Sequence, residues 1–101
     1  MKQDEVLSVL GLARRANKTA VGFDLISQKA REGSVALLLL AQDCSEATKK
    51  AYRNKCRFYH IPWEEYGTAE TIGKSVGRQK IAAVAVCDEG FCTLLYKKLR
   101  G

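Results

Sequence analysis

The sequence has no apolar run long enough to cross a membrane. Its longest, from Val35 to Ala41, is far shorter than the roughly 20 residues that a spanning helix needs. The chain starts Met-Lys-Gln-Asp-Glu, without the apolar segment of a secretory signal. We therefore expect a cytoplasmic protein with no membrane partner.

Cysteine occurs only four times, and its spacing lacks the common metal and redox motifs. No two cysteines are arranged as C-x-x-C, and His60 is the only histidine. We predict no metal site and no cofactor. Reduced, buried thiols are the favoured state, with disulfides or a metal as the minor alternative, for Cys44, Cys56, Cys87 and Cys92.

Nothing in the sequence divides the chain. It has no linker, repeat or low-complexity segment, so residues 1–101 should form one domain. Its 17 Lys+Arg against 11 Asp+Glu give a net charge of +6. Solubility alone could explain this excess, but a pI near 9.3 on so small a domain favours a polyanionic partner.

The spacing of apolar residues predicts alternating helices and strands. Two all-apolar strands need cover on both faces, which predicts an α/β fold, a three-layer α/β/α sandwich around a mixed sheet. We expect helices over 3–15, 22–32, 46–59, 69–75 and 89–99, and strands over 19–21, 35–41, 61–66 and 81–87.

Local signals add detail to these elements. Either Asp43 or Ser45 could cap the helix at 46–59, whose five cations we interpret as a solvated outer face. Thr68 and Asp88 should cap the two helices that follow them. In the helix at 22–32, the residues expected to face inward are Phe23, Ile26 and Ala30.

One segment is similar to an enzymatic motif. Residues 67–75, GTAETIGKS, look like a phosphate-binding Walker A loop, with Asp88 placed to hold magnesium. The motif needs four residues between its glycines, and here there are five. Ser45, Ser75 and His60 show no catalytic arrangement either. We predict no catalytic residues, and an NTPase is the least favoured function.

Two basic, glycine-bearing segments, 14–22 and 73–80, support binding instead. No acidic residue lies between Thr71 and Cys87. A helix that starts at Gly22 would add unpaired backbone N–H groups and a positive dipole end. A sandwich could bring both segments to one edge, where they would suit RNA phosphates and unpaired bases.

The chain also resembles a known family. The run LGLARRANK, then Gly22, then KAREGSVALLLLAQD is similar to the ribosomal protein L-seven-Ae family, which includes the L-thirty-e group. The later segments DCSEATKKAYRNKC, TIGKSVGR and IAAVAVCDEGF follow in the same order. The resemblance implies a four-stranded mixed sheet and RNA binding without catalysis. In this family the usual target is the kink-turn, a sharp bend built on sheared G·A pairs.

The resemblance also implies where RNA binds. The helix that starts at the glycine enters the RNA groove, and the loop before the last strand covers an extruded base. To the arginines of the basic turn, Arg14 and Arg15, this adds Lys18, Gly22, Phe23, Asp24, Leu25, Gln28, Gly77, Arg78, Gln79 and Lys80.

Three of these positions differ from the family's pattern. The kink-turn readers are Asn and Glu, then Lys three positions after that Glu; here they are Asp24, Leu25 and Gln28. The main hypothesis is therefore a monomeric protein that binds structured RNA, with the ribosome as one setting. The alternative is a protein-interaction module of the same fold that has lost kink-turn specificity.

Overall fold

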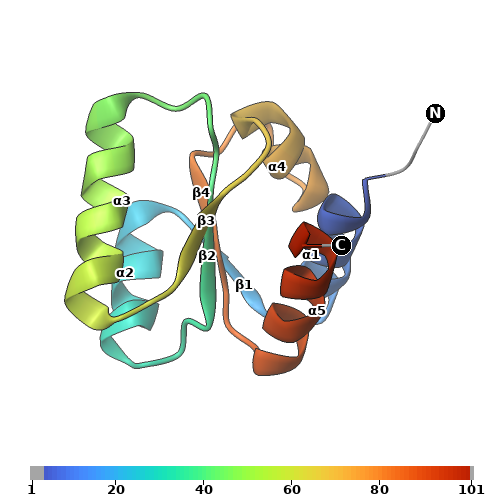
Figure 1. Cartoon of the computed structure of the whole chain (residues 1–101), viewed down its shortest axis with the longest axis horizontal. Helices are drawn as coiled ribbons and strands as arrows, with labels where there is room; N and C mark the ends of the chain where they lie inside the picture. The colour runs from blue at the N-terminus through green and yellow to red at the C-terminus, as the bar shows by residue number, and fades with distance from the viewer. Residues whose placement is uncertain (1–3, 101) are drawn as a thin grey trace.

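Helices and strands alternate along the chain and stack in three layers (Figure 1). The structure is a computed structural model that describes residues 4–100. The first residue of the predicted helix 3–15 lies outside this range. The elements are α1 (Glu5–Arg15), β1 (Thr19–Val21), α2 (Phe23–Arg31), β2 (Leu37–Leu40), α3 (Glu46–Tyr59), β3 (Trp63–Glu65), α4 (Ala69–Ser75), β4 (Ala83–Val86) and α5 (Glu89–Arg100).

The four strands form one mixed sheet in the order β1-β4-β2-β3. Strand β4 runs antiparallel to β1 and β2, while β2 and β3 are parallel. The two all-apolar strands are therefore central, as predicted, and β1 is an edge strand. Val21 pairs with Val84, so the end of β1 lies beside the start of β4.

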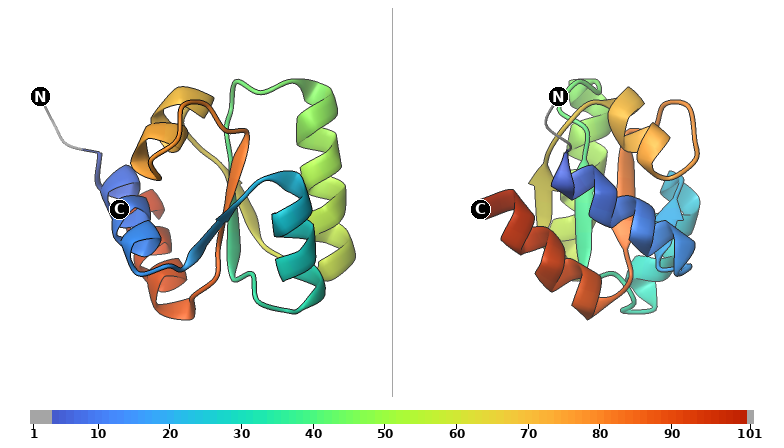
Figure 2. Two further views of the ribbon diagram at one scale, coloured as in Figure 1. Left: turned by 180° about the vertical axis from the view of Figure 1, so that it is seen from behind. Right: turned by 90° about the vertical axis from the view of Figure 1, so that its right-hand side faces the viewer.

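Helices cover both faces of the sheet, with α2 and α3 on one side and α1, α4 and α5 on the other (Figures 1 and 2). Alternate residues of the central strands face opposite layers. Leu37 and Leu39 pack into the cluster with α1, α4 and α5, whereas Leu38 and Leu40 pack into the cluster with α2 and α3. This two-sided burial confirms the predicted sandwich.

Side chains cap most of the helix starts. Asp4 accepts a hydrogen bond from the Leu7 amide at 3.1 Å, and Asp88 accepts one from the Phe91 amide at 2.9 Å. Ser45 caps α3. Thr68 caps α4 in a reciprocal capping box with Thr71.

Several details differ from the sequence predictions. Asp43 does not cap α3; its carboxylate accepts a hydrogen bond from the Ala69 amide at 2.8 Å, at the start of α4. The strands predicted at 35–41, 61–66 and 81–87 are shorter and span Leu37–Leu40, Trp63–Glu65 and Ala83–Val86. No helix within residues 4–100 combines the length and apolar character needed to span a membrane.

The prediction that Phe23 faces inward was wrong. Its side chain is 40% exposed, while Ile26 and Ala30 are buried as expected. Buried Tyr52 of α3 fills the space between the two helices, and Phe23 packs edge-on against it with ring centroids 5.2 Å apart. The interpretation of α3 as a solvated face was also incomplete, because Arg53 donates to Glu65 at 3.1 Å.

Candidate nucleic-acid interface

Helix α2 begins without a side-chain cap, unlike the other helices of residues 4–100. Its N-cap is exposed Gly22, with φ 98° and ψ 136°, a conformation that suits glycine. The first amide bonded within the helix is that of Ile26, which donates to the Gly22 carbonyl at 2.9 Å. The three preceding amides therefore sit in an exposed first turn, together with the positive end of the helix dipole.

The loop Gly77–Lys80 follows α4 and packs directly on it. The Arg78 amide donates to the Gly73 carbonyl at 2.7 Å. Gly73 is buried, and a Cβ there would lie 2.3 Å from the Gln79 carbonyl oxygen. The loop's four residues are nevertheless all exposed. The loop backbone thus packs against α4, while its side chains face solvent.

Arg14 joins the two basic segments. Its guanidinium covers Gly77 so closely that a Cβ on the glycine would lie 2.8 Å from Arg14 Nη2. The pairing of Val21 with Val84 places the start of α2 at the same end of the sheet as the loop. In the right-hand view of Figure 2, the end of α1, the start of α2 and this loop all lie towards one edge.

Lys18 lies next to the end of α1, where its amide donates to the Ala13 carbonyl at 2.9 Å. Its carbonyl accepts a hydrogen bond from the Cys87 amide at 2.8 Å, at the end of β1 opposite Gly22. On α2, Asp24, Leu25 and Gln28 are exposed, and Gln28 donates to Glu32 at 3.3 Å. Leu25 is 42% exposed.

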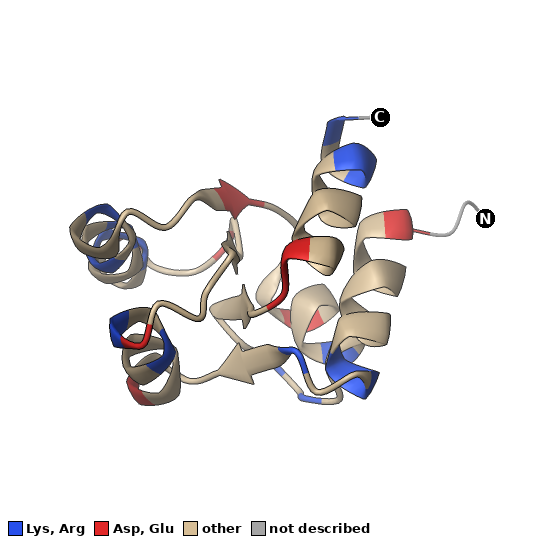
Figure 3. Cartoon of the chain, turned by 90° about the horizontal axis from the view of Figure 1, so that it is seen from below, with Lys and Arg blue, Asp and Glu red and all other residues tan. Residues whose placement is uncertain are grey.

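The ion pairs of residues 4–100 involve other residues than the cations of this edge. The cations of these ion pairs lie on α2, α3 and α5, and their acidic partners are Glu5, Glu32, Glu46 and Glu65. Figure 3 shows basic segments at the end of α1 and in the loop beyond α4, on the same side of the view. In the same part of the chain, no ion pair is made by Arg14, Arg15, Lys18, Lys74, Arg78 or Lys80.

Lys74 is the residue that the sequence-based site left out. With the loop it lines a surface hollow of about 530 Å³ formed by Glu70, Lys74, Arg78, Gln79 and Lys80. The signal was present, because Lys74 lies in the basic segment 73–80 and four residues before Arg78. The packing of the loop on α4 is what brings its side chain to the site.

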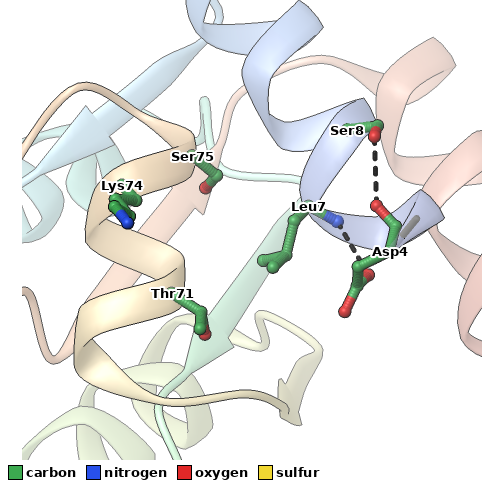
Figure 4. A pocket seen from close by; sticks show the side chains of 6 residues that line it. All are labelled: Asp4, Leu7, Ser8, Thr71, Lys74 and Ser75. Atoms are coloured by element: carbon green, nitrogen blue, oxygen red, sulfur yellow. Dashed lines mark hydrogen bonds between the residues drawn. The ribbon is translucent and has the colours of Figure 1, made fainter. Parts of the chain in front are cut away.

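A second hollow, of about 460 Å³, lies between α1 and α4 (Figure 4). Its hydroxyl groups serve the local backbone: Ser75 donates to the Ile72 carbonyl at 2.7 Å, and Thr71 belongs to the capping box. Gly73, the second glycine of the Walker-like segment, lies inside α4 rather than in a loop. This segment therefore lacks the phosphate-cradling conformation of a Walker A loop.

The thiols are free in the structure, and burial raises their pKa values. Burial raises the pKa of Cys56 to about 11. These thiols are therefore protonated at neutral pH and poorly suited to nucleophilic chemistry. Within residues 4–100, no group of three His, Cys, Asp or Glu side chains is arranged to hold a metal ion.

Residues 4–96 match the model of the ribosomal protein L7Ae/L30e/S12e/Gadd45 family. The chain belongs to this family. Membership confirms the relationship inferred from the ordered motifs, and the observed sandwich confirms the fold expected for it. The roles of individual residues in RNA binding stay predictions.

Two curated relatives and one solved structure extend this result. The chain is 36% identical over 95 residues to the RNA-binding protein YlxQ of Bacillus subtilis, covering 94% of this chain and 95% of the relative. It is 26% identical over 99 residues to the RNA-binding protein YlxQ of Enterococcus faecium, covering 98% and 95%. A Bacillus halodurans protein of unknown function superposes with a TM-score of 0.90 at 30% identity, covering 98% of this chain and all of that one.

Proposed function

We propose that the protein is a non-enzymatic RNA-binding protein that contacts structured RNA with the start of α2 and the loop Gly77–Lys80. The observation that carries the proposal is the uncapped start of α2 beside a group of cations that make no ion pair within residues 4–100. The names of both curated relatives support it. We expect the protein to act as a cytoplasmic monomer, with ribosomal RNA among its possible targets.

Each part of the surface suits a different part of an RNA. The first amides of α2 and its dipole favour phosphate oxygens. Exposed Arg78 and Lys80 add positive charge for further phosphates, and Asp24 offers an acceptor to a guanine amino group. A kink-turn or a related bent fold would present backbone and base edges together, as this surface requires.

Phosphate contacts should supply most of the affinity. Leu25 cannot hydrogen-bond to a base edge, and Gln28 lacks the charge of lysine. We therefore expect binding that is strongly salt-dependent, with only a modest preference for intact G·A pairs. If four phosphates are neutralised, affinity should fall about a hundredfold between roughly 50 and 200 mM salt.

The alternative function is protein binding by the same fold. The observation that favours it is the apolar character of the first turn of α2, where Phe23 is 40% exposed and Leu25 is 42% exposed. Such a module would bind RNA weakly and without regard to sequence, and it would hold a protein partner tightly.

The test is an equilibrium titration at two salt concentrations. The RNAs are a kink-turn hairpin and the same hairpin with both G·A pairs replaced. We expect the double variant Arg78→Ala, Lys80→Ala to bind both RNAs more weakly and to reduce the salt slope by about two. The matched control, Lys97→Ala with Arg100→Ala on α5, removes the same charge and should leave binding unchanged. Equal affinities and slopes for the wild type and the Arg78, Lys80 variant would exclude the loop from the site.

A further inference from the structure

A strongly exposed aromatic ring lies on the most basic helix of the protein. Phe58, in the last turn of α3, is 75% exposed, more than any other large apolar side chain of residues 4–100. Exposing such a ring to water is unfavourable, and Phe58 contributes nothing to the two buried clusters. Its exposure calls for an explanation outside the fold.

Phe58 belongs to a groove between α2 and α3. The groove measures about 430 Å³ and is lined by Phe23, Ala51, Asn54, Lys55, Phe58 and Tyr59. The rings of Phe58 and Tyr59 meet edge to face at 4.8 Å. Lys55 Nζ lies 5.3 Å from the Phe23 ring centre and 5.9 Å from that of Tyr59. The groove thus combines aromatic faces with a central ammonium group.

The charge along α3 after Glu46 is of one sign. Between Glu46 and Glu64 the sequence contains five cations and no acid. Two of them, Lys49 and Arg53, pair with Glu46 at the start of α3 and with Glu65 of β3. Within residues 4–100, no ion pair is made by the three others, Lys50, Lys55 and Arg57.

The groove is also continuous with the proposed RNA surface. Phe23 is the first residue of α2, next to Gly22, and it forms one wall of the groove. A strand that leaves the start of α2 would therefore reach the groove directly across Phe23. Figure 1 shows α2 and α3 side by side in the layer that contains the groove.

We infer that this groove binds an unpaired nucleotide of the RNA, with its base stacked on Phe58 and its phosphate near Lys55. The inference rests on the proposed function for the location of the rest of the RNA. Aromatic rings stack on any base, and adjacent cations attract its phosphates, so the pair of features suits a single strand. An apolar protein helix would gain nothing from the cations, and this charge pattern favours RNA.

The test compares a structured hairpin without overhangs, the same hairpin with an unpaired adenosine tail at either end, and free oligoadenosine. Phe58→Ala should weaken binding of a tailed hairpin and of oligoadenosine about tenfold, within the range for losing one stacked base. Binding of the hairpin without a tail should not change. Because Phe58 is mostly exposed, Phe58→Ala should fold normally, and circular dichroism checks this.

Three further variants define the contact. Phe58→Tyr keeps an aromatic face and should bind as the wild type does. Phe58→Leu keeps an apolar side chain but cannot stack, and it should bind as weakly as Phe58→Ala. Leu12→Ala removes a side chain that is 49% exposed on α1, in the opposite layer, and should have no effect.

Two results would overturn the inference: equal binding of tailed RNA and oligoadenosine by the wild type and Phe58→Ala, or full binding by Phe58→Leu, which would indicate a merely apolar contact. The proposed function fails separately, if the Arg78, Lys80 variant binds the hairpin without a tail as the wild type does. In that case the binding of oligoadenosine by the wild type and by Phe58→Ala still tests the groove.

Discussion

Replacing Gly73 with alanine tests how the loop Gly77–Lys80, which we propose binds RNA, is held against α4. The new Cβ would lie 2.3 Å from the Gln79 carbonyl oxygen and 2.8 Å from its carbon, where ordinary contact begins near 3.4 Å. Both neighbours are backbone atoms, so no side chain can rotate away. The loop must retreat by about 1 Å, which also strains the 2.7 Å hydrogen bond from the Arg78 amide to the Gly73 carbonyl.

Two effects of opposite sign decide the change in stability. Alanine in a helix interior is favoured over glycine by about 1 kcal/mol. Overpacking a tight site costs about 1–3 kcal/mol, and weakening the hydrogen bond adds to that cost. We therefore expect Gly73→Ala to lower the free energy of unfolding by about 1 kcal/mol and to weaken RNA binding through the displaced loop.

Gly11→Ala is the matched control. Gly11 lies inside α1, and its Cβ would meet the Ser75 carbonyl oxygen at 3.4 Å, an ordinary contact. Only the helix preference then acts, so this variant should gain up to about 1 kcal/mol and bind RNA normally. The two variants should differ by about 2 kcal/mol, or roughly 10 °C in Tm.

Thermal and urea unfolding measure the stabilities, and RNA titration well below both Tm values measures the binding. If Gly73→Ala were stabilised as much as Gly11→Ala and bound RNA normally, the loop could not pack on α4 as described. Loss of stability with unchanged RNA binding would separate the loop's position from RNA recognition.

Further predictions concern the turn before α2 and the pH dependence of stability. Gly22→Val should lower the free energy of unfolding by about 1–3 kcal/mol, because the φ of 98° at this position suits glycine. A urea midpoint equal to that of the wild type would contradict this. The hydrogen bond from Arg53 lowers the pKa of Glu65. The stability that this pair contributes is therefore complete above about pH 4.5 and is lost as the pH falls towards the lowered pKa. Glu65→Gln should therefore flatten the acid limb of a pH series of unfolding curves, and an unchanged limb would show that the pair does not contribute. Burial and the hydrogen bond to Asp4 raise the pKa of Tyr66 to about 12, so stability should fall between about pH 10 and 12, less so in Tyr66→Phe; equal losses in both proteins would contradict this.

Much of the fold could be predicted because its signals are local. The apolar runs around Leu37–Leu40 and Ala83–Val86 contain no polar residue that could face water, which predicts central strands. Thr68 and Asp88 precede their helices at cap positions and act there. In each case a few neighbouring residues determine the result.

The errors and omissions arise where distant residues decide. Phe23 has the helical spacing of a core residue, but its exposure depends on Tyr52, which comes 29 positions later. The Tyr52 ring is buried between α2 and α3, and Phe23 packs against its outer side. The contact of Arg14 with Gly77 joins residues 63 positions apart. The sequence places Arg14 and Gly77 in two basic segments, but it does not show that these segments meet.

The sequence therefore supplied a set of predicted site residues, whose roles stay predictions, but only part of the surface on which they lie. All of these residues are exposed, and the loop, α1 and the start of α2 share one edge. Lys74 and the aromatic groove were missed, because each depends on how one helix packs against its neighbour.

The most direct test of the central claim is to map RNA contacts on the ¹⁵N-labelled protein by amide chemical-shift changes during titration with a kink-turn hairpin. We predict the largest changes at the amides of Phe23, Asp24 and Leu25 and in the loop Gly77–Lys80, with smaller ones around Arg14. Changes concentrated on α5 and β3, or none at RNA concentrations that saturate the protein's family relatives, would contradict the account.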